Sequence, residues 1–227
     1  MAKPVAVPYV TLNVAVSADG KIATRRRESF PLGSQEDRHL MDVLRSRADA
    51  VVVGANTVRK DGWAIRVRDA ALRRARRAGP HPLNVVLTSR LDLPQRRQFF
   101  THPDTDKLVI TTRAAPDARV RRFERHAEVV VLAGTRIRPA VVVALLAKRG
   151  MKRILLEGGG ELNYSFFKDK VIDEVYLTVT PRILGGSDAP SAVDGAGFLQ
   201  HSQVRLELVS SRRREDEVFL RYRVIKS

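Results

Sequence analysis

The chain has 227 residues, of which 41 are Lys or Arg and 25 are Asp or Glu, so its formal net charge is +16. Hydrophobic residues make up 44% of the chain, which suits one ordinary folded domain and excludes a disordered chain. Cysteine is absent, which excludes disulfides, thiolate nucleophiles and cysteine zinc sites and favours a cytoplasmic location. The proline-interrupted N-terminus does not resemble a signal peptide, and the longest apolar run, 140–147, is too short for a membrane span.

The first half of the chain alternates predicted strands with predicted helices. Residues 9–16 alternate in polarity and are rich in β-branched residues, so they predict a strand that ends in a turn at 17–20. Ser34 is a predicted helix N-cap with Asp37 in the capping-box position, and apolar spacing continues this helix to about Arg47. The short apolar runs 50–53, 85–87 and 108–110 predict buried strands, and residues 69–78 predict a helix before Gly79-Pro80.

The second half begins with the same alternation and then changes. Strands are predicted at 129–132 and 154–156, and helices at 117–125 and 139–148. The segments 174–180, 204–209 and 218–224 then follow one another with no helical pattern between them. We therefore predict an α/β fold, in which a mostly parallel central sheet is flanked by helices and finished by antiparallel C-terminal strands. No repeat or linker interrupts the pattern, so residues 1–227 are expected to form a single domain.

A run of three glycines, Gly158 to Gly160, follows the predicted strand 154–156 and precedes a pattern that can open a helix. Glycines at a strand-to-helix turn let the main chain approach a ligand, and the free amides at a helix start favour a phosphate. A dinucleotide cofactor would suit this turn. Asn163 stands where the dinucleotide fingerprint has its last glycine, so a tight turn without a ligand is the alternative interpretation.

Polar residues also follow other predicted strands. After Gly54, Thr57 and Asp61 are four residues apart, so a helical turn places a hydroxyl and a carboxylate on one face. Taken alone, Asp61 is more typical of an exposed acid or a helix cap, and Asp19 of a turn former. The pairs Ser89-Arg90 and Thr112-Arg113 are weak candidates for holding the phosphate that distinguishes NADP from NAD.

Other chemistries find little support. The five histidines show no metal-ligand spacing and no GxSxG elbow is present, so neither a metal site nor a serine hydrolase is expected. The positive charge attracts phosphates, but no RNA-binding signature, zinc finger or aromatic-interleaved stripe accompanies it. Nucleic-acid binding therefore rests on charge alone, and most of the arginines, which come in short clusters such as the one at 73–77, are interpreted as solvated surface. Trp63, the only tryptophan, is either a core residue or a ring that stacks on a flat ligand.

Five segments together resemble a known family in content and order: 17–23 (SADGKIA), 44–45 (LR), 49–61 (DAVVVGANTVRKD), 156–162 (LEGGGEL) and 173–186 (DEVYLTVTPRILGG). The chain resembles the RibD C-terminal reductase domain of riboflavin biosynthesis, which has a dihydrofolate-reductase-like fold. The resemblance spans nearly the whole chain. It implies an NADPH-dependent reduction of a ribosylaminopyrimidine 5′-phosphate, in which hydride reaches C1′ of the ring-opened imine and a ribitylamino chain results.

The resemblance also assigns roles to residues. It implies cofactor contacts at Ala15, Thr57, Asp61, Ser89, Gly159, Gly160, Glu161 and Leu162. It implies substrate contacts at Ser29, Arg45, Ile65, Arg68 and Glu157, with Arg68 and Arg45 suited to the substrate phosphate. Asp61 would also lie near the charge that develops at C1′. A homodimer is implied as well.

The sequence departs from the family after Asp61, where Gly62-Trp63 replaces the usual Asp or Asn followed by Pro, and Ile65-Arg66 replaces a usual Leu-Thr. Because this loop is expected to touch the substrate, a pterin, folate or other heterocycle reductase on the same fold is the alternative within enzymes. A nucleic-acid-binding protein is the alternative from another class. Deamination would need a second polypeptide, because the chain lacks the cysteine ligands of a deaminase zinc site.

Overall fold

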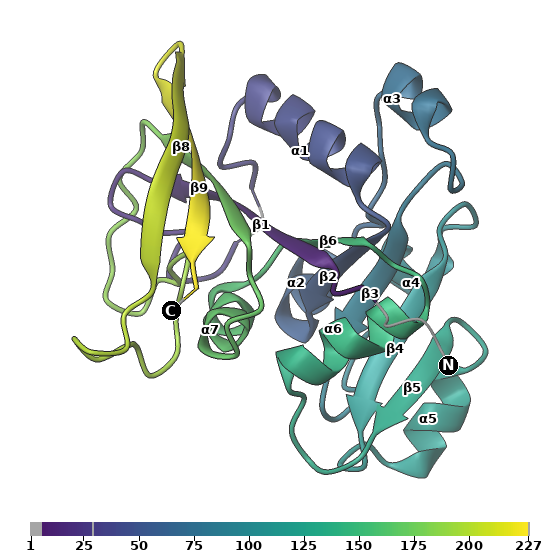
Figure 1. The fold of residues 1–227 in the computed structure, drawn as a ribbon. Helices are drawn as coiled ribbons and strands as arrows, with labels where there is room; N and C mark the ends of the chain where they lie inside the picture. The colour runs from purple at the N-terminus through teal and green to yellow at the C-terminus, as the bar shows by residue number, and fades with distance from the viewer. Residues whose placement is uncertain (1–5, 29, 227) are drawn as a thin grey trace. The chain divides into compact units, whose positions relative to one another are not determined.

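The structure is a computed structural model that describes residues 6–28 and 30–226 (Figure 1). The chain divides into two compact units. The first contains Asp42–Leu155 together with the residues up to Tyr9, and the second contains Val10–Met41 together with the residues from Leu156 onward. The single-domain interpretation stays a prediction.

The first unit is built on parallel strands. They are β2 (Ala50–Gly54), β3 (Leu83–Leu87), β4 (Lys107–Thr112), β5 (Glu128–Leu132) and β6 (Arg153–Leu156), in the sheet order β5-β4-β3-β2-β6. The pairs β2–β3, β3–β4 and β4–β5 are parallel. The helices of this unit are α2 (Ala55–Lys60), α3 (Ala70–Ala75), α4 (Gln98–Thr101), α5 (Asp117–Phe123) and α6 (Pro139–Lys148).

The core of the first unit lies on both faces of this sheet. Val51, Val52, Val85 and Val86 are each completely buried, although neighbouring residues of a strand point to opposite faces. Both faces are therefore covered, as is usual for parallel sheets with helical connections. Such an arrangement leaves the carboxyl ends of the strands and the loops that follow them as the places where a ligand can bind.

The second unit contains both parallel and antiparallel strand pairs. Its strands are β1 (Tyr9–Ser17), β7 (Glu174–Thr180), β8 (Arg205–Arg214) and β9 (Glu217–Ile225), in the order β1-β7-β9-β8. β1 and β7 are parallel, whereas β9 runs antiparallel to both β7 and β8. Helix α7 (Gly160–Lys168) belongs to this unit, and α1 (Gln35–Arg47) begins in it. The predicted fold class, a mostly parallel sheet with antiparallel C-terminal strands, is confirmed.

Element boundaries differ from the prediction where distant residues intervene. The helix predicted for 69–78 ends at Ala75, because Arg76 takes an extended conformation and its guanidinium binds the end of α1. β8 continues past the predicted end at Val209 to Arg214, because pairing with β9 holds the polar residues in the ladder. Within the described residues, no helix is both long and apolar enough to cross a membrane.

Candidate functional site

In the first unit, three of the predicted cofactor residues lie at the carboxyl ends of neighbouring strands. Gly54 at the end of β2 pairs with Leu87 at the end of β3, so α2 and the loop carrying Ser89 start from the same edge. Thr57 lies in α2, and its carbonyl accepts a hydrogen bond from the Asp61 N–H at 2.8 Å. The predicted helical turn from Thr57 to Asp61 is therefore confirmed.

The loop after Asp61 begins with the residues that depart from the family pattern. Gly62 has a φ of +63°, and a Cβ there would run into the side chain of Arg97, so only glycine fits without a rearrangement. Its carbonyl accepts a hydrogen bond from Phe99 N–H at 2.8 Å. Trp63 is 59% exposed, so the core interpretation of this residue is wrong and its ring is available to a ligand or to solvent.

Asn84 of β3, which the sequence analysis did not single out, fixes this loop. The side chain is completely buried. Its Nδ2 donates to the carbonyls of Ile65 and Pro82 at 3.0 and 2.9 Å, and its Oδ1 accepts from Ile65 N–H at 2.8 Å. Ile65 is itself only 6% exposed, so the structure anchors the predicted substrate-contact residue by its backbone. A single Asn before a run of valines gave no sequence signal for this role.

Arginines hold the next part of the loop. Arg45 is 7% exposed and its Nη1 donates to the carbonyl of Arg66, while Nη1 of Arg73 donates to the carbonyls of Val67 and Arg68. The Arg68 side chain is exposed. The backbone around Arg68 is thus fixed while its guanidinium faces solvent, the arrangement expected of a residue that receives an anionic group.

Arg76 is an exception to the interpretation of most arginines as solvated surface. Its Nη1 donates to the carbonyls of Arg45, Ser46 and Ala48 at 2.7–2.9 Å, which satisfies the C-terminal end of α1. Burial lowers the pKa of this guanidinium from its ordinary value, and the Asp49 carboxylate opposes that shift. Arg73 and Arg76 are therefore structural residues, whereas Arg74 and Arg77 are exposed.

In the second unit, the glycine turn lies where the sequence predicted it. Glu157 follows β6 directly, the Gly158–Gly159 peptide bond is cis, and α7 begins at Gly160. No side chain caps α7 at its Gly159 N-cap, and a Cβ on Gly159 would meet nothing within 4 Å. The first turn of α7 carries Glu161 and Leu162, and Gly160 is buried against the Ser191–Asp194 loop. The helix start is thus open at Gly159 and covered at Gly160 by the loop that carries the Asp194 carboxylate.

Asn163, which departs from the dinucleotide fingerprint, secures this turn. It is completely buried, its Nδ2 donates to the Ala192 carbonyl at 2.8 Å, and a Cβ on Gly158 would lie 3.1 Å from Nδ2. Its Oδ1 has no hydrogen-bond partner among the described residues. A buried amide oxygen without a partner costs free energy unless a water or ligand reaches it.

The predicted cofactor residue Ala15 lies in a polar row that the sequence analysis missed. On β1 its neighbours on the same face are Asn13 and Ser17, and its partner across the parallel pair is Thr178 of β7. The side-chain oxygens of Asn13, Thr178 and Thr180 are buried and have no hydrogen-bond partner among the described residues. The alternation Thr-Val-Thr at 178–180 of β7 could have predicted this row, because alternate residues of a strand lie on the same face and both hydroxyls therefore share one face.

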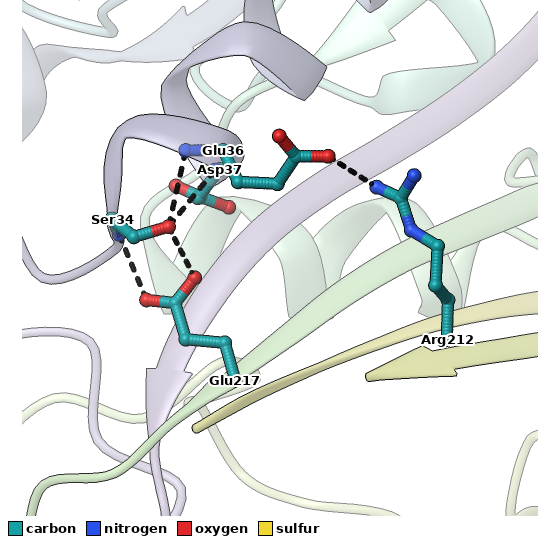
Figure 2. A network of polar contacts seen from close by, with 5 residues as sticks. All are labelled: Ser34, Glu36, Asp37, Arg212 and Glu217. Atoms are coloured by element: carbon teal, nitrogen blue, oxygen red, sulfur yellow. Dashed lines mark hydrogen bonds and ion pairs between the residues drawn. The ribbon is translucent and has the colours of Figure 1, made fainter. Parts of the chain in front are cut away.

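Helix α1 starts in a carboxylate network that crosses to β9 (Figure 2). The hydroxyl of Ser34 accepts hydrogen bonds from the N–H groups of Glu36 and Asp37, which confirms the predicted N-cap. Glu217 occupies the position expected for Asp37 in a capping box, because its carboxylate accepts from Ser34 N–H at 2.8 Å and from the Ser34 hydroxyl at 2.6 Å. The predicted partner was wrong, because the acceptor comes from a distant strand.

The Asp37 carboxyl is thereby left for other contacts. Burial raises its pKa above the ordinary value, and the negative charges of Glu217 and Glu157 act in the same direction. The Thr178 hydroxyl faces this carboxyl and partly offsets the rise in its pKa. The polar row around Ala15, the carboxylate of Glu157 and that of Asp37 thus belong to one neighbourhood of the second unit.

Two further residues complete the account of the predicted site. Ser89 is exposed and follows β3, where its carbonyl accepts the Thr112 hydroxyl at 3.0 Å. Ser29, the remaining predicted substrate contact, lies outside the described residues. Within the described part of the chain, no group of three or more His, Asp or Glu side chains is arranged to hold a metal ion.

Taken together, the parallel strands, the antiparallel hairpin and the polar groups at strand ends define an α/β protein with the dihydrofolate reductase fold. Dihydrofolate reductase from Enterococcus faecalis superposes with a TM-score of 0.54, covering 96% of this chain and 97% of that chain at 14% identity. At this identity the likeness is one of fold alone.

The chain belongs to the RibD C-terminal domain family, whose model matches residues 8–220. It is 34% identical over 200 residues to the 2,5-diamino-6-ribosylamino-4(3H)-pyrimidinone 5′-phosphate reductase of Archaeoglobus fulgidus, covering 87% of this chain and 91% of the relative. It also superposes on a pyrimidine reductase-like protein from Corynebacterium diphtheriae with a TM-score of 0.86 and 26% identity, covering 97% of this chain and 93% of that chain.

Proposed function

We propose that the chain is an NADPH-dependent reductase of riboflavin biosynthesis, which converts the ribosylamino group of a pyrimidine ribosylamino 5′-phosphate into a ribitylamino group. The observation that carries this proposal is the 34% identity to the Archaeoglobus fulgidus reductase along 87% of the chain. The family relatives favour this activity over a pterin or folate reductase and over nucleic-acid binding. A homodimer and a cytoplasmic location are part of the same proposal.

The start of α7 supports nucleotide binding. The Gly159 N-cap of α7 makes no side-chain cap bond, and the helix dipole favours negative charge at this end of the helix. Gly159 leaves space for a phosphate beside the main chain, and Gly160, Glu161 and Leu162 are the further cofactor contacts that the family resemblance implies. Bound NADPH supplies a hydride. The buried Oδ1 of Asn13 has no hydrogen-bond partner among the described residues and lies on the same face of β1 as Ala15, which favours contact of this row with a polar group such as the nicotinamide carboxamide.

Thr57, Asp61 and Ser89, which lie in the first unit, are further cofactor contacts that the family resemblance implies. Asp61 ends α2, so its carboxylate is held on a short helix one turn beyond Thr57. We assign to this carboxylate the stabilisation of the iminium character that develops at C1′ of the ring-opened substrate. Hydride addition to C1′ and protonation of the attached nitrogen together yield the secondary amine of the product.

The substrate assignments follow the chemistry of the side chains. Arg68 presents an exposed guanidinium on a backbone that Arg73 fixes, which suits the 5′-phosphate. Arg45 directs one nitrogen at the Arg66 carbonyl and therefore steadies the same loop. Glu157 offers a carboxylate to the amino groups of the pyrimidine, and Ile65 and Ser29 complete the predicted set.

The test is a titration of the purified protein with NADPH and NADH, followed by a turnover assay with the ribosylaminopyrimidine phosphate. We expect saturable cofactor binding with a rise in Tm, and product formation that requires NADPH. Asp61→Asn should retain NADPH binding and lower kcat about 100-fold or more, because the charge at C1′ loses its counterion. Asp104→Asn, a change at an exposed loop position of the same unit, is the matched control. Absence of binding by either nucleotide would refute the proposal.

A further inference from the structure

The connection between β7 and β8 spans residues 181–204 (Figure 1). We call its first part, residues 182–194, the strap. The strap leaves the carboxyl end of β7, is hydrogen-bonded to the loop that follows β1, and reaches the start of α7. All of these segments belong to the second unit. The strap therefore joins two of the segments on which the family resemblance rests, 17–23 and 156–162.

The Asp19 carboxylate binds the near end of the strap. Its Oδ1 accepts a hydrogen bond from the Ser17 hydroxyl at 2.6 Å and one from Leu184 N–H at 3.1 Å. Its Oδ2 accepts a hydrogen bond from Gly185 N–H at 2.7 Å. These donors lower the pKa of Asp19 to about 2, so the carboxylate is ionised near neutral pH. An ionised acceptor makes stronger hydrogen bonds to main-chain amides than a neutral one, so the strap is firmly held here.

Main-chain hydrogen bonds continue this attachment along the strap. Ala18 N–H donates to the carbonyl of Arg182 at 2.7 Å. Further on, Ile22 N–H donates to the carbonyl of Pro190 at 2.9 Å. The strap is thus bound to the loop after β1 on both sides of the segment that Asp19 holds.

The far end of the strap packs on the start of α7. Asp194 N–H donates to the Gly160 carbonyl at 3.1 Å, and Nδ2 of the buried Asn163 donates to a strap carbonyl at 2.8 Å. A Cβ on Gly160 would run into the Asp194 carboxylate and the Ser191 carbonyl, so strap and helix are in direct contact. The Ser191 N–H and hydroxyl both donate to Asp194 Oδ1 and fix this carboxylate. The position of the strap therefore sets the space and the negative charge beside the first turn of α7.

We propose that Asp19 is a positioning residue for cofactor binding, which holds the strap against the start of α7 and thereby sets the affinity for NADPH. This inference rests on the proposed function, in which a phosphate of NADPH binds beside Gly159. Asp19 itself touches no ligand. Without its carboxylate the strap is freed at one end, and the Asp194 carboxylate at the other end is no longer kept in one place. Binding of NADPH must then order the strap as well, which lowers the affinity.

A role in the turn alone does not account for these contacts. Gly20 N–H donates to the Ser17 carbonyl at 2.8 Å, so the main chain closes the turn without the carboxylate. The hydrogen bonds from Leu184 and Gly185 come from residues 165 and 166 positions away in the chain. Two of the three donors to Asp19 thus act on the strap and not on the turn.

The experiment compares purified wild type, Asp19→Asn and Asp188→Asn in NADPH titrations and in steady-state assays. Asp19→Asn should raise the Kd and the KM for NADPH about tenfold, with kcat at saturating NADPH and the KM for the pyrimidine substrate within about twofold of wild type. Partial unfolding would instead lower the apparent kcat and leave both KM values unchanged. Asp188→Asn removes the same charge from an exposed residue of the strap, so it is the matched control and should behave as wild type.

A double-mutant cycle and hydrogen exchange test whether the effect passes through the strap. Asp19 and Asp194 bind different residues at the two ends of the strap. If both act on NADPH through it, the effects of Asp19→Asn and Asp194→Asn on the Kd should not add. In the absence of nucleotide, the strap amides and the first turn of α7 should exchange faster in Asp19→Asn than in Asp188→Asn.

Four results would each overturn the inference: NADPH binding by Asp19→Asn within about twofold of wild type, an equal rise in both KM values, additive effects in the cycle, or unchanged exchange at the start of α7. Failure of the proposed function gives a different result, because wild type would then bind neither NADPH nor NADH. A wild type that binds NADPH beside an unaffected Asp19→Asn refutes the positioning role and leaves the reductase proposal standing.

Discussion

Replacing Asn84 with Leu tests how the loop after Asp61 is held. Leu has the same number and branching of side-chain heavy atoms as Asn, so the change removes hydrogen bonds without leaving a cavity. Three backbone groups lose their partner: the N–H and C=O of Ile65, at 2.8 and 3.0 Å, and the C=O of Pro82, at 2.9 Å. Because Asn84 is completely buried, water cannot replace it without opening the structure.

The expected cost follows from those three groups. Each buried backbone group left unpaired costs about 1–3 kcal/mol, and local relaxation lowers the sum, so Asn84→Leu should reduce the free energy of unfolding by about 3–5 kcal/mol. For a chain of this size that corresponds to a fall in Tm of about 10 °C. The loop 61–69 should also exchange its amide hydrogens faster, because its main anchor to β3 is gone.

Urea unfolding and hydrogen exchange measured by mass spectrometry are the assays. Asn56→Leu is the matched control, because Asn56 is exposed and its one side-chain contact is with Arg59 at the surface of α2. That control should change the free energy of unfolding by no more than about 0.5 kcal/mol. If Asn84→Leu unfolded within about 1 kcal/mol of the wild type, the claim that Asn84 anchors the loop would be wrong.

Three further changes test separate parts of the structure. Arg76→Met should lower the free energy of unfolding by about 1–3 kcal/mol, because it uncaps the end of α1, whereas Arg77→Met should have little effect in the same urea titration. The Ser17 hydroxyl and the Leu184 and Gly185 amides lower the pKa of Asp19 to about 2, so its contribution to stability is full above pH 3.8 and is lost as pH falls towards 2. The Tm difference between wild type and Asp19→Asn should therefore shrink over that interval. Arg68→Ala should raise the substrate KM about tenfold or more with a smaller effect on kcat, and an unchanged KM in steady-state assays would exclude a phosphate contact.

Local patterns in the sequence were sufficient for the elements themselves. β7 at 174–180 and α6 at 139–148 have the predicted bounds, because each is specified by the spacing of its own apolar residues. The Ser34 N-cap was also predicted correctly, since a cap involves residues within one turn. The Thr57-to-Asp61 turn belongs to the same class.

Local sequence patterns could not predict the hydrogen-bond partner of each polar group. Glu217, not Asp37, binds the Ser34 N–H, although Ser34 and Glu217 are 183 positions apart in the chain. Arg76 looked like one of several surface arginines until the fold brought the end of α1 to it. Asn84 and Thr178 lie among apolar residues of buried strands. The sequence pattern there predicts a strand, but it does not indicate which groups the polar side chain will contact.

The sequence by itself determined which segments form strands and helices, because periodicity and capping depend on residues close together in the chain. It also determined the family, through motifs that are read without any structure. Tertiary structure alone decided which side chain satisfies each buried polar group, how the loop after Asp61 is anchored, and which residues of β8 and β9 lie opposite one another. The physical reason is that burial and hydrogen bonding depend on neighbours in space, and the register shift after Leu208 changes those neighbours without any mark in the local pattern.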